Sequence, residues 1–145
     1  MPVLLVRHGE AVASQGDDAH RYLTFKGRAD TTKVGVALRG RKVVASQIVA
    51  SPLVRAVQTA ELLGAALGFE GIITTDPAFV PEGDPGAAAK RIPISAGVTI
   101  VVCHEPIVRG IATALSGQPH PGFRTSGCVL IEWTRITLSL SPDTL

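Results

Sequence analysis

The sequence predicts an α/β fold, a three-layer α/β/α sandwich with a mainly parallel central sheet, in one domain over residues 1–145. Along the 145 residues, short apolar runs alternate with segments of helical spacing, as expected when helices connect parallel strands. Hydrophobic residues make up 46% of the chain and charged residues 18%, which is typical of a folded globular protein. Aromatic residues make up only 4%, so aliphatic side chains must fill the core. Parallel strands covered on both faces suit that composition.

Apolar and β-branched runs mark the expected strands. The run Val98–Cys103 is uninterrupted and is the best candidate for a central strand. A strand at 3–6 ends abruptly at Arg7, and strands at 128–133 and 136–140 are expected to pair antiparallel at an edge. The remaining expected strands are 47–50 and 72–74.

Helical spacing of apolar residues marks the expected helices. The clearest helix runs from Leu53 to Leu67, with Pro52 near its first turn and Gly68 at its end. Another is expected to start near Gly27 and to stop at Gly40, a C-terminal glycine signal. A third covers 107–115, while 11–22 and 76–86 are expected to be mostly irregular.

Composition and charge also limit the function classes. The net charge is +2 and no polybasic run occurs, so neither nucleic acid nor a membrane surface is an expected partner. Cys103 and Cys128 lack the spacing of a zinc site or a disulfide framework and are expected to be core thiols. No apolar stretch is long enough to span a bilayer, and the first residues do not resemble a signal peptide. A cytoplasmic location is therefore expected.

Two histidines follow directly after predicted strands. His8 follows the first strand and His104 follows the central strand, and ligands of open α/β sheets bind beyond the carboxyl ends of the strands. Arg7 adjoins His8, and Arg55 lies at the start of the clearest helix. Taken alone, a histidine after a strand or an arginine near a helix start more often has a structural role than a catalytic one. If the four side chains converge, however, they form a receptacle for a phosphoryl group, because guanidinium forks and helix N-termini bind phosphate oxygens.

These residues lie in recognisable motifs. Residues 5–10, Leu-Val-Arg-His-Gly-Glu, resemble the opening motif of the histidine phosphatase (phosphoglycerate mutase-like) superfamily. Residues 51–60 are similar to that family's Ser-Pro-x-x-Arg-Ala-x-Gln-Thr helix start, and Leu23-Thr24 with Gly27 resembles its next segment. Val102-Cys103-His104 matches the strand that delivers the second histidine. The motifs occur in the family's order over nearly the whole chain.

The resemblance implies a role for each of these residues. His8 would attack phosphorus and become a transient phosphohistidine, while Arg7, Arg55 and His104 hold the phosphoryl oxygens. The backbone N–H of Glu105 would also point at phosphate. The implied enzyme is a hydrolase of the EC 3.1.3 type that needs no metal and no cofactor. The proton donor stays open, with Glu82 preferred to Asp84.

The stretch between Asp76 and Gly97 is too short for the insertion that roofs the pocket in mutases and larger phosphatases of this superfamily. The missing insertion implies a shallow site, and in this respect the chain resembles the SixA-type phosphohistidine phosphatase branch. A phosphorylated protein is therefore the expected partner. An imidazole leaving group, whose conjugate acid has a pKa of about 6.5, needs little acid catalysis. The alternatives are a phosphatase of small phosphate esters that uses Glu82 as its acid, and a non-catalytic phosphate-binding module.

Several other polar residues have less certain roles. Arg21, Lys26 and Arg28 border the pocket or belong to a solvated face, and the second interpretation is favoured. His20 and His120 are expected at the surface. No HxxxH pair occurs, so a zinc hydrolase is not indicated.

Overall fold

One six-stranded sheet, in the order β3-β2-β4-β1-β5-β6, organises the chain. A computed structural model describes residues 1–14 and 16–145. The strands are β1 (Pro2–Arg7), β2 (Ala45–Ala50), β3 (Thr74–Thr75), β4 (Val98–Cys103), β5 (Cys128–Glu132) and β6 (Arg135–Leu140). The α-helices are α1 (Phe25–Gly40), α2 (Val54–Leu67), α3 (Pro85–Lys90) and α4 (Ile107–Ser116), with 3-10 turns at Asp18–His20, Pro77–Phe79 and Pro142–Thr144.

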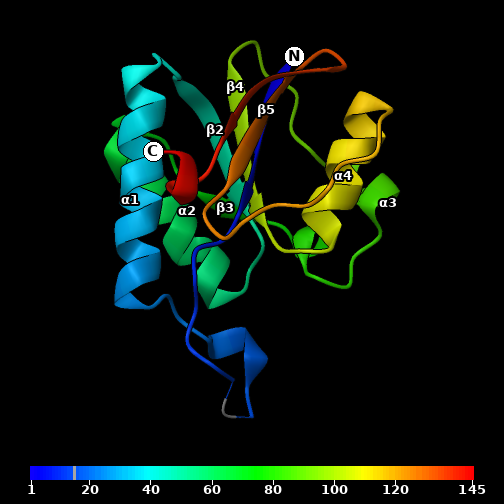
Figure 1. Ribbon diagram of the computed structural model, residues 1–145. Helices are drawn as coiled ribbons and strands as arrows, with labels where there is room; N and C mark the ends of the chain where they lie inside the picture. The colour runs from blue at the N-terminus through cyan, green and yellow to red at the C-terminus, as the bar shows by residue number, and fades with distance from the viewer. Residues whose placement is uncertain (15) are drawn as a thin grey trace.

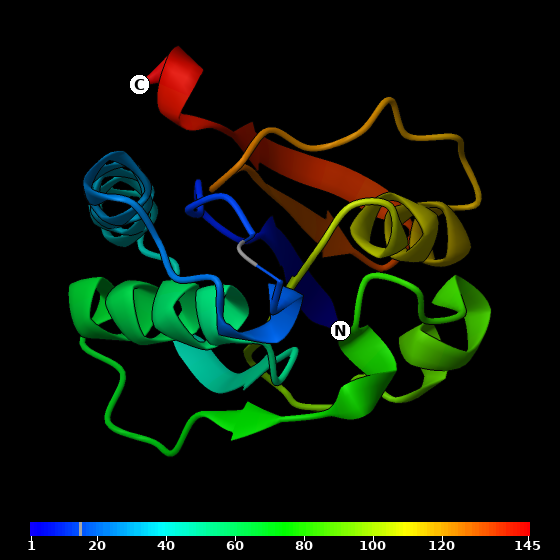
Figure 2. The ribbon, with the colours of Figure 1, turned by 90° about the horizontal axis from the view of Figure 1, so that it is seen from below.

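Helices cover both faces of this sheet, which confirms the predicted sandwich. In Figures 1 and 2, α1 and α2 lie on one face, and α3 and α4 lie on the other. The alternation of strand side chains explains the two layers of core. Leu4 and Val6 point into the cluster with α1 and α2, whereas Val3 and Leu5 point into the cluster with α4.

Parallel pairing brings the carboxyl ends of the central strands to one edge. Strands β1 and β2 each pair in parallel with β4, while β5 pairs antiparallel with both β1 and β6. The register places Arg7 opposite Cys103 and Ala50 opposite Val102. The residues that follow β1, β2 and β4 therefore lie side by side, at the edge that Figure 2 views from below.

Helix α1 begins before its predicted start near Gly27 and ends at Gly40. It begins at Phe25 because Thr24 caps it, with the Thr24 hydroxyl accepting a hydrogen bond from the Gly27 N–H at 2.9 Å. The helix stops at Gly40, as predicted, but that glycine is still helical and is not the left-handed residue of a C-terminal glycine signal. The left-handed turn is made by Lys42 instead, at φ 64°. In contrast, α2 ends at Gly68 as predicted, with φ 69° at that glycine.

Smaller corrections concern strand ends. The third strand lies at Thr74–Thr75 rather than at 72–74, because Ile72 is 85% exposed and pairs with no strand. Strand β5 ends at Glu132, and Trp133 instead takes a positive φ in the turn to β6. Strand β4 has the predicted limits.

Both cysteines lie in the core, as predicted. Burial raises the pKa of each thiol to about 12. In the described ranges, no helix is both long and apolar enough to cross a membrane. The cytoplasmic location stays a prediction.

Candidate active site

The two predicted histidines lie side by side at the carboxyl edge of the sheet. The backbone N–H of His8 donates to the carbonyl of Cys103 at 3.0 Å, which continues the β1–β4 pairing beyond β1. The ring centroids of His8 and His104 are 5.0 Å apart. Both residues are buried, with 8% and 1% of their surface exposed.

The ring of His8 is fixed by its own loop. Its Nδ1 lies 2.7 Å from the carbonyl oxygen of Gly9. A carbonyl only accepts hydrogen bonds, so Nδ1 carries the proton and Nε2 keeps its lone pair. Gly9 must be glycine here, because a Cβ would lie 2.8 Å from the Thr31 hydroxyl and 2.9 Å from the carbonyl oxygen of Gly27. This loop presents an unprotonated ring nitrogen, as a nucleophilic histidine requires.

A buried hydroxyl holds the second histidine. The Oγ of Ser51 lies 2.8 Å from Nε2 of His104. The same Oγ accepts a hydrogen bond from the backbone N–H of Leu53 at 3.3 Å. The hydroxyl proton can then be donated to Nε2, and in that arrangement the proton of His104 lies on Nδ1. In the described ranges, this Nδ1 is buried without a hydrogen-bond partner.

The two predicted arginines are anchored from different segments. Nη1 of Arg7 donates to the carbonyl of Phe123 at 2.8 Å. Nη1 of Arg55 donates to the carbonyl of Asp18 at 2.8 Å, and its Nη2 lies 3.1 Å from the carboxylate of Asp18. Arg55 is only 4% exposed. Among the described residues, the Nε atoms of Arg7 and Arg55 are buried and unpaired, so both guanidinium groups keep a donor for a ligand.

A threonine hydroxyl connects the two halves of the site. Oγ1 of Thr59 donates to the carbonyl of Arg55 at 2.8 Å and accepts from the backbone N–H of Gly9 at 3.0 Å. Thr59 is fully buried. The loop that carries His8 is therefore tied to the first turn of α2.

Burial and positive charge keep both histidines neutral. Burial, together with the charges of Arg55, Arg7 and Arg21, lowers the pKa of His8 to about 4, against the opposing effect of the hydrogen bond to Gly9. Burial, with the neighbouring His8 and Arg55, lowers the pKa of His104 to about 3. Burial also lowers the pKa of Arg7. An anion bound here would offset this concentration of positive charge.

The predicted acids lie at the neighbouring loop. Glu82 is exposed, while Asp84 caps α3 by accepting from the Ala87 N–H at 2.8 Å. A Cβ on Gly83 would lie 2.7 Å from Cδ1 of Ile107, so this loop packs against the start of α4, three residues after His104. The role of Glu82 stays a prediction, and so does that of the Glu105 backbone N–H. The Glu105 side chain accepts from the Phe123 N–H at 2.6 Å.

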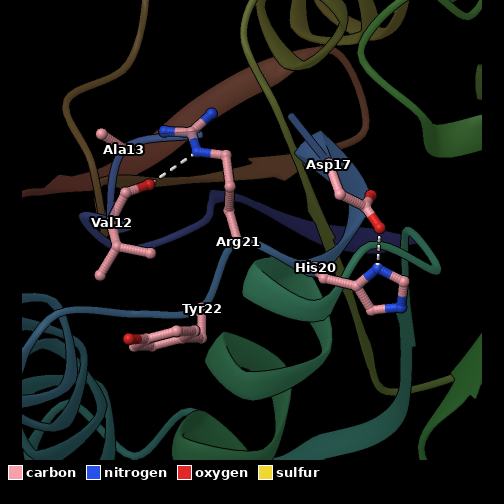
Figure 3. Close-up of a pocket in the computed structure, with 6 residues that line it drawn as sticks. All are labelled: Val12, Ala13, Asp17, His20, Arg21 and Tyr22. Atoms are coloured by element: carbon pink, nitrogen blue, oxygen red, sulfur yellow. Dashed lines mark hydrogen bonds and ion pairs between the residues drawn. The ribbon is translucent and has the colours of Figure 1, made fainter. Parts of the chain in front are cut away.

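A surface hollow of about 410 Å³ opens beside the site, but its lining does not include Arg7, His8, Arg55 or His104. Figure 3 shows Arg21 there, turned toward Val12, and His20 paired with Asp17. Arg21 also contacts Asp18 at 3.0 Å and lowers the pKa of His8, so it borders the pocket, contrary to the favoured solvated interpretation.

Lys26 pairs with Asp30 at 2.6 Å, and Arg28 is exposed. His20 is exposed and His120 half-buried against Phe123.

Comparison with known proteins agrees with this geometry. The family model described as "Histidine phosphatase superfamily (branch 1)" matches residues 3–80. The chain belongs to this superfamily. That membership confirms the resemblance found in the sequence motifs and agrees with the phosphoglycerate mutase-like fold.

Individual relatives point to one branch of the histidine phosphatases. Phosphohistidine phosphatase SixA of Escherichia coli (strain K12) is 31% identical over 131 residues, which cover 87% of this chain and 81% of that protein. The structure of the protein histidine phosphatase SixA complexed with tungstate has a TM-score of 0.91 at 27% identity, over 99% of both chains. A SixA protein of Agrobacterium tumefaciens has a TM-score of 0.85 at 25% identity, over 97% of both chains.

Neutral histidines in this histidine phosphatase predict acid sensitivity of the fold. In the unfolded chain both residues regain a pKa of about 6.5. The unfolded state then binds more protons than the folded state below that pH, so stability falls as the pH drops from about 6.5 toward the folded pKa values. We expect the free energy of unfolding to be about 2 to 5 kcal/mol lower at pH 4.5 than at pH 7. Urea unfolding at the two pH values measures this difference.

The variant His104→Asn isolates the contribution of this buried ring. It should unfold with a clearly smaller pH dependence than the wild type, whereas His20→Asn, at an exposed position, should keep the wild-type dependence. An unchanged pH dependence in His104→Asn would show that carboxylates, not the buried histidines, cause the loss at low pH.

Proposed function

We propose that this protein hydrolyses phosphohistidine on a partner protein, with His8 as the nucleophile. One observation carries the proposal. The ring of His8, with Nε2 unprotonated, lies 5.0 Å from the ring of His104, and Arg7 and Arg55 are close enough to lower its pKa. Among the described residues, Nε of Arg7, Nε of Arg55 and Nδ1 of His104 are buried without a hydrogen-bond partner. A nucleophile surrounded by unpaired donors suits a tetrahedral oxyanion. A relative solved with tungstate, which is such an oxyanion, supports this assignment.

The reaction proceeds in two displacements at phosphorus. Nε2 of His8 attacks, a P–N bond to His8 forms, and the P–N bond of the substrate breaks with its electron pair returning to the substrate imidazole. Water then attacks the phosphorylated His8, which releases inorganic phosphate and restores the lone pair of Nε2. Arg7, Arg55 and His104 stabilise the charge that spreads over the phosphoryl oxygens in both transition states. The arginines supply the positive charge that a metal supplies elsewhere.

The open surroundings of the site favour a protein substrate. Between β3 and β4 the chain forms only a 3-10 turn and α3, a helix of six residues. Such a short connection does not add a lid domain over the carboxyl edge of the sheet. A phosphorylated side chain on a protein surface can therefore approach His8. The relatives named SixA are described as a phosphohistidine phosphatase and a protein histidine phosphatase, which agrees with this substrate.

Hydrolysis of small phosphate esters is the second candidate, and the packing of the Glu82 loop against α4 favours it. We expect Glu82→Gln to keep kcat/KM for a phosphohistidine peptide within about twofold, because imidazole leaves without strong acid catalysis. The same variant should lower kcat/KM for an alkyl phosphate by about tenfold or more. Steady-state assays on the two substrates decide the matter, with Asp84→Asn as the control because asparagine also caps α3. An equal loss on both substrates would count against the preference for phosphohistidine.

A further inference from the structure

A carboxylate lies directly on a phosphate-binding arginine. The Oδ2 of Asp18 is 3.1 Å from Nη2 of Arg55, and its Oδ1 is 3.0 Å from Nη1 of Arg21. The side chain of Asp18 is 57% exposed, while that of Arg55 is 4% exposed. The carboxylate therefore sits between the buried guanidinium and solvent, at the mouth of the site.

A negative charge at this place opposes the binding of any phosphate. It repels a phosphoryl dianion and competes with it for Arg55. Anchoring of Arg55 does not require the charge, since the backbone carbonyl of Asp18 already accepts from Nη1 at 2.8 Å. The charge becomes favourable only if the substrate brings a positive group to the same place.

Asp18 is not suited to deliver a proton. Its hydrogen bonds with Arg21 and Arg55 lower its pKa, so it is ionised at neutral pH. It can still accept hydrogen bonds. Each carboxylate oxygen holds two lone pairs, and each accepts one bond from an arginine. One lone pair on each oxygen remains for a donor that comes from solvent or from a substrate.

Phosphohistidine brings such a donor, and phosphate esters do not. When the substrate ring is protonated, the nitrogen remote from phosphorus carries an N–H and the ring is cationic. The P–N bond then breaks with its electron pair returning to the ring, and neutral imidazole leaves with that N–H in place. No further acid is needed. An alkoxide or phenolate leaving group carries no positive charge at any stage.

We propose that the carboxylate of Asp18 accepts a hydrogen bond from the ring N–H of the protonated substrate phosphohistidine, and that it thereby selects N–P over O–P substrates. This inference rests on the proposed function. Asp18 becomes a specificity-determining residue that stabilises the cationic leaving group and weakens the binding of other phosphates.

Asp18→Asn tests the inference, because it removes the charge and keeps an oxygen that can accept from an arginine. We measure kcat/KM on a phosphohistidine peptide and on p-nitrophenyl phosphate, together with the inhibition constant of inorganic phosphate. The ratio of the two kcat/KM values should fall by about tenfold or more, through loss on the peptide. Inorganic phosphate should inhibit the variant more strongly than the wild type.

Asp17→Asn is the matched control. Asp17 is one residue away on the same exposed turn, caps it by accepting from the Ala19 N–H at 3.1 Å, and pairs with His20 rather than with an arginine. Asparagine preserves this cap while it removes the same charge. The substrate ratio of this variant should stay within about twofold of the wild type. A tenfold change in both variants would mean that the net charge of the turn, not the position of Asp18, sets the preference.

Two results for Asp18→Asn would overturn the inference. An equal loss on both substrates would make Asp18 a support for Arg55, and an equal gain would make it a competing anion only. Both results leave the proposed function intact if the wild type hydrolyses the phosphohistidine peptide. A wild type that hydrolyses only the ester would instead refute the proposed function, and the inference with it.

Discussion

Replacing His8 by Asn is expected to lower kcat on every phosphorylated substrate by at least about 10⁴-fold. Nε2 of His8 is the nitrogen left unprotonated by the hydrogen bond from Nδ1 to Gly9, and asparagine has no nucleophile at that position. Its side-chain amide can still donate to the carbonyl of Gly9, so the loop should keep its conformation. Rapid-quench labelling should find acid-labile phosphate on His8 in the wild type and none in the variant.

An exposed histidine provides the control for this experiment. His20 lies within the same stretch between β1 and α1, and its side chain is 76% exposed. The variant His20→Asn should therefore keep its turnover within about twofold. A phosphoryl label at a residue other than His8, or near-normal turnover in His8→Asn, would refute His8 as the nucleophile and leave a phosphate-binding module as the better account.

The fold was predictable where one residue pattern outweighed the alternatives. Strand β4 matches its prediction because a run of β-branched residues is both buried and bounded, by Gly97 before it and His104 after it. The end of α2 was also predictable, since Gly68 takes the left-handed conformation that favours glycine. The last residue of α1 was predicted as well, but the turn after it was not, because Gly40 is still helical and the left-handed residue is Lys42, a type of residue that does not signal such a turn.

The central residues of the site were predictable because local rules applied to each of them. His8 and His104 follow buried strands, and parallel pairing brings such positions together. The supporting contacts depend on distant segments instead. Asp18 meets Arg55 across 37 positions, and Ser51 meets His104 across 53. Ser51 and Thr59 lie inside a recognised motif, but no local pattern indicated what their hydroxyls hold. Asp18 lies in a polar segment that offered no signal at all.

Arg55→Lys is expected to lower kcat/KM by about 10²- to 10³-fold although the positive charge is kept. The guanidinium of Arg55 has two tasks at once. Its Nη atoms bond the carbonyl and the carboxylate of Asp18, which leaves Nε, buried and without a partner among the described residues, for a phosphoryl oxygen. A lysine ammonium is a single compact charge that cannot hold Asp18 and present a donor at a fixed angle. Steady-state kinetics and inhibition by inorganic phosphate measure both consequences.

The expected defect has a distinct signature because both tasks depend on the planar fork. If lysine still neutralises the pocket, inorganic phosphate should bind only about tenfold more weakly while kcat falls much further, since the transition state needs oriented donors more than the bound ground state does. Arg39→Lys, at an exposed position in the last turn of α1, is the control and should keep wild-type kinetics. Equal losses in phosphate binding and in kcat/KM, with kcat unchanged, would contradict this account. Arg55 would then contribute charge to binding and nothing specific to the transition state.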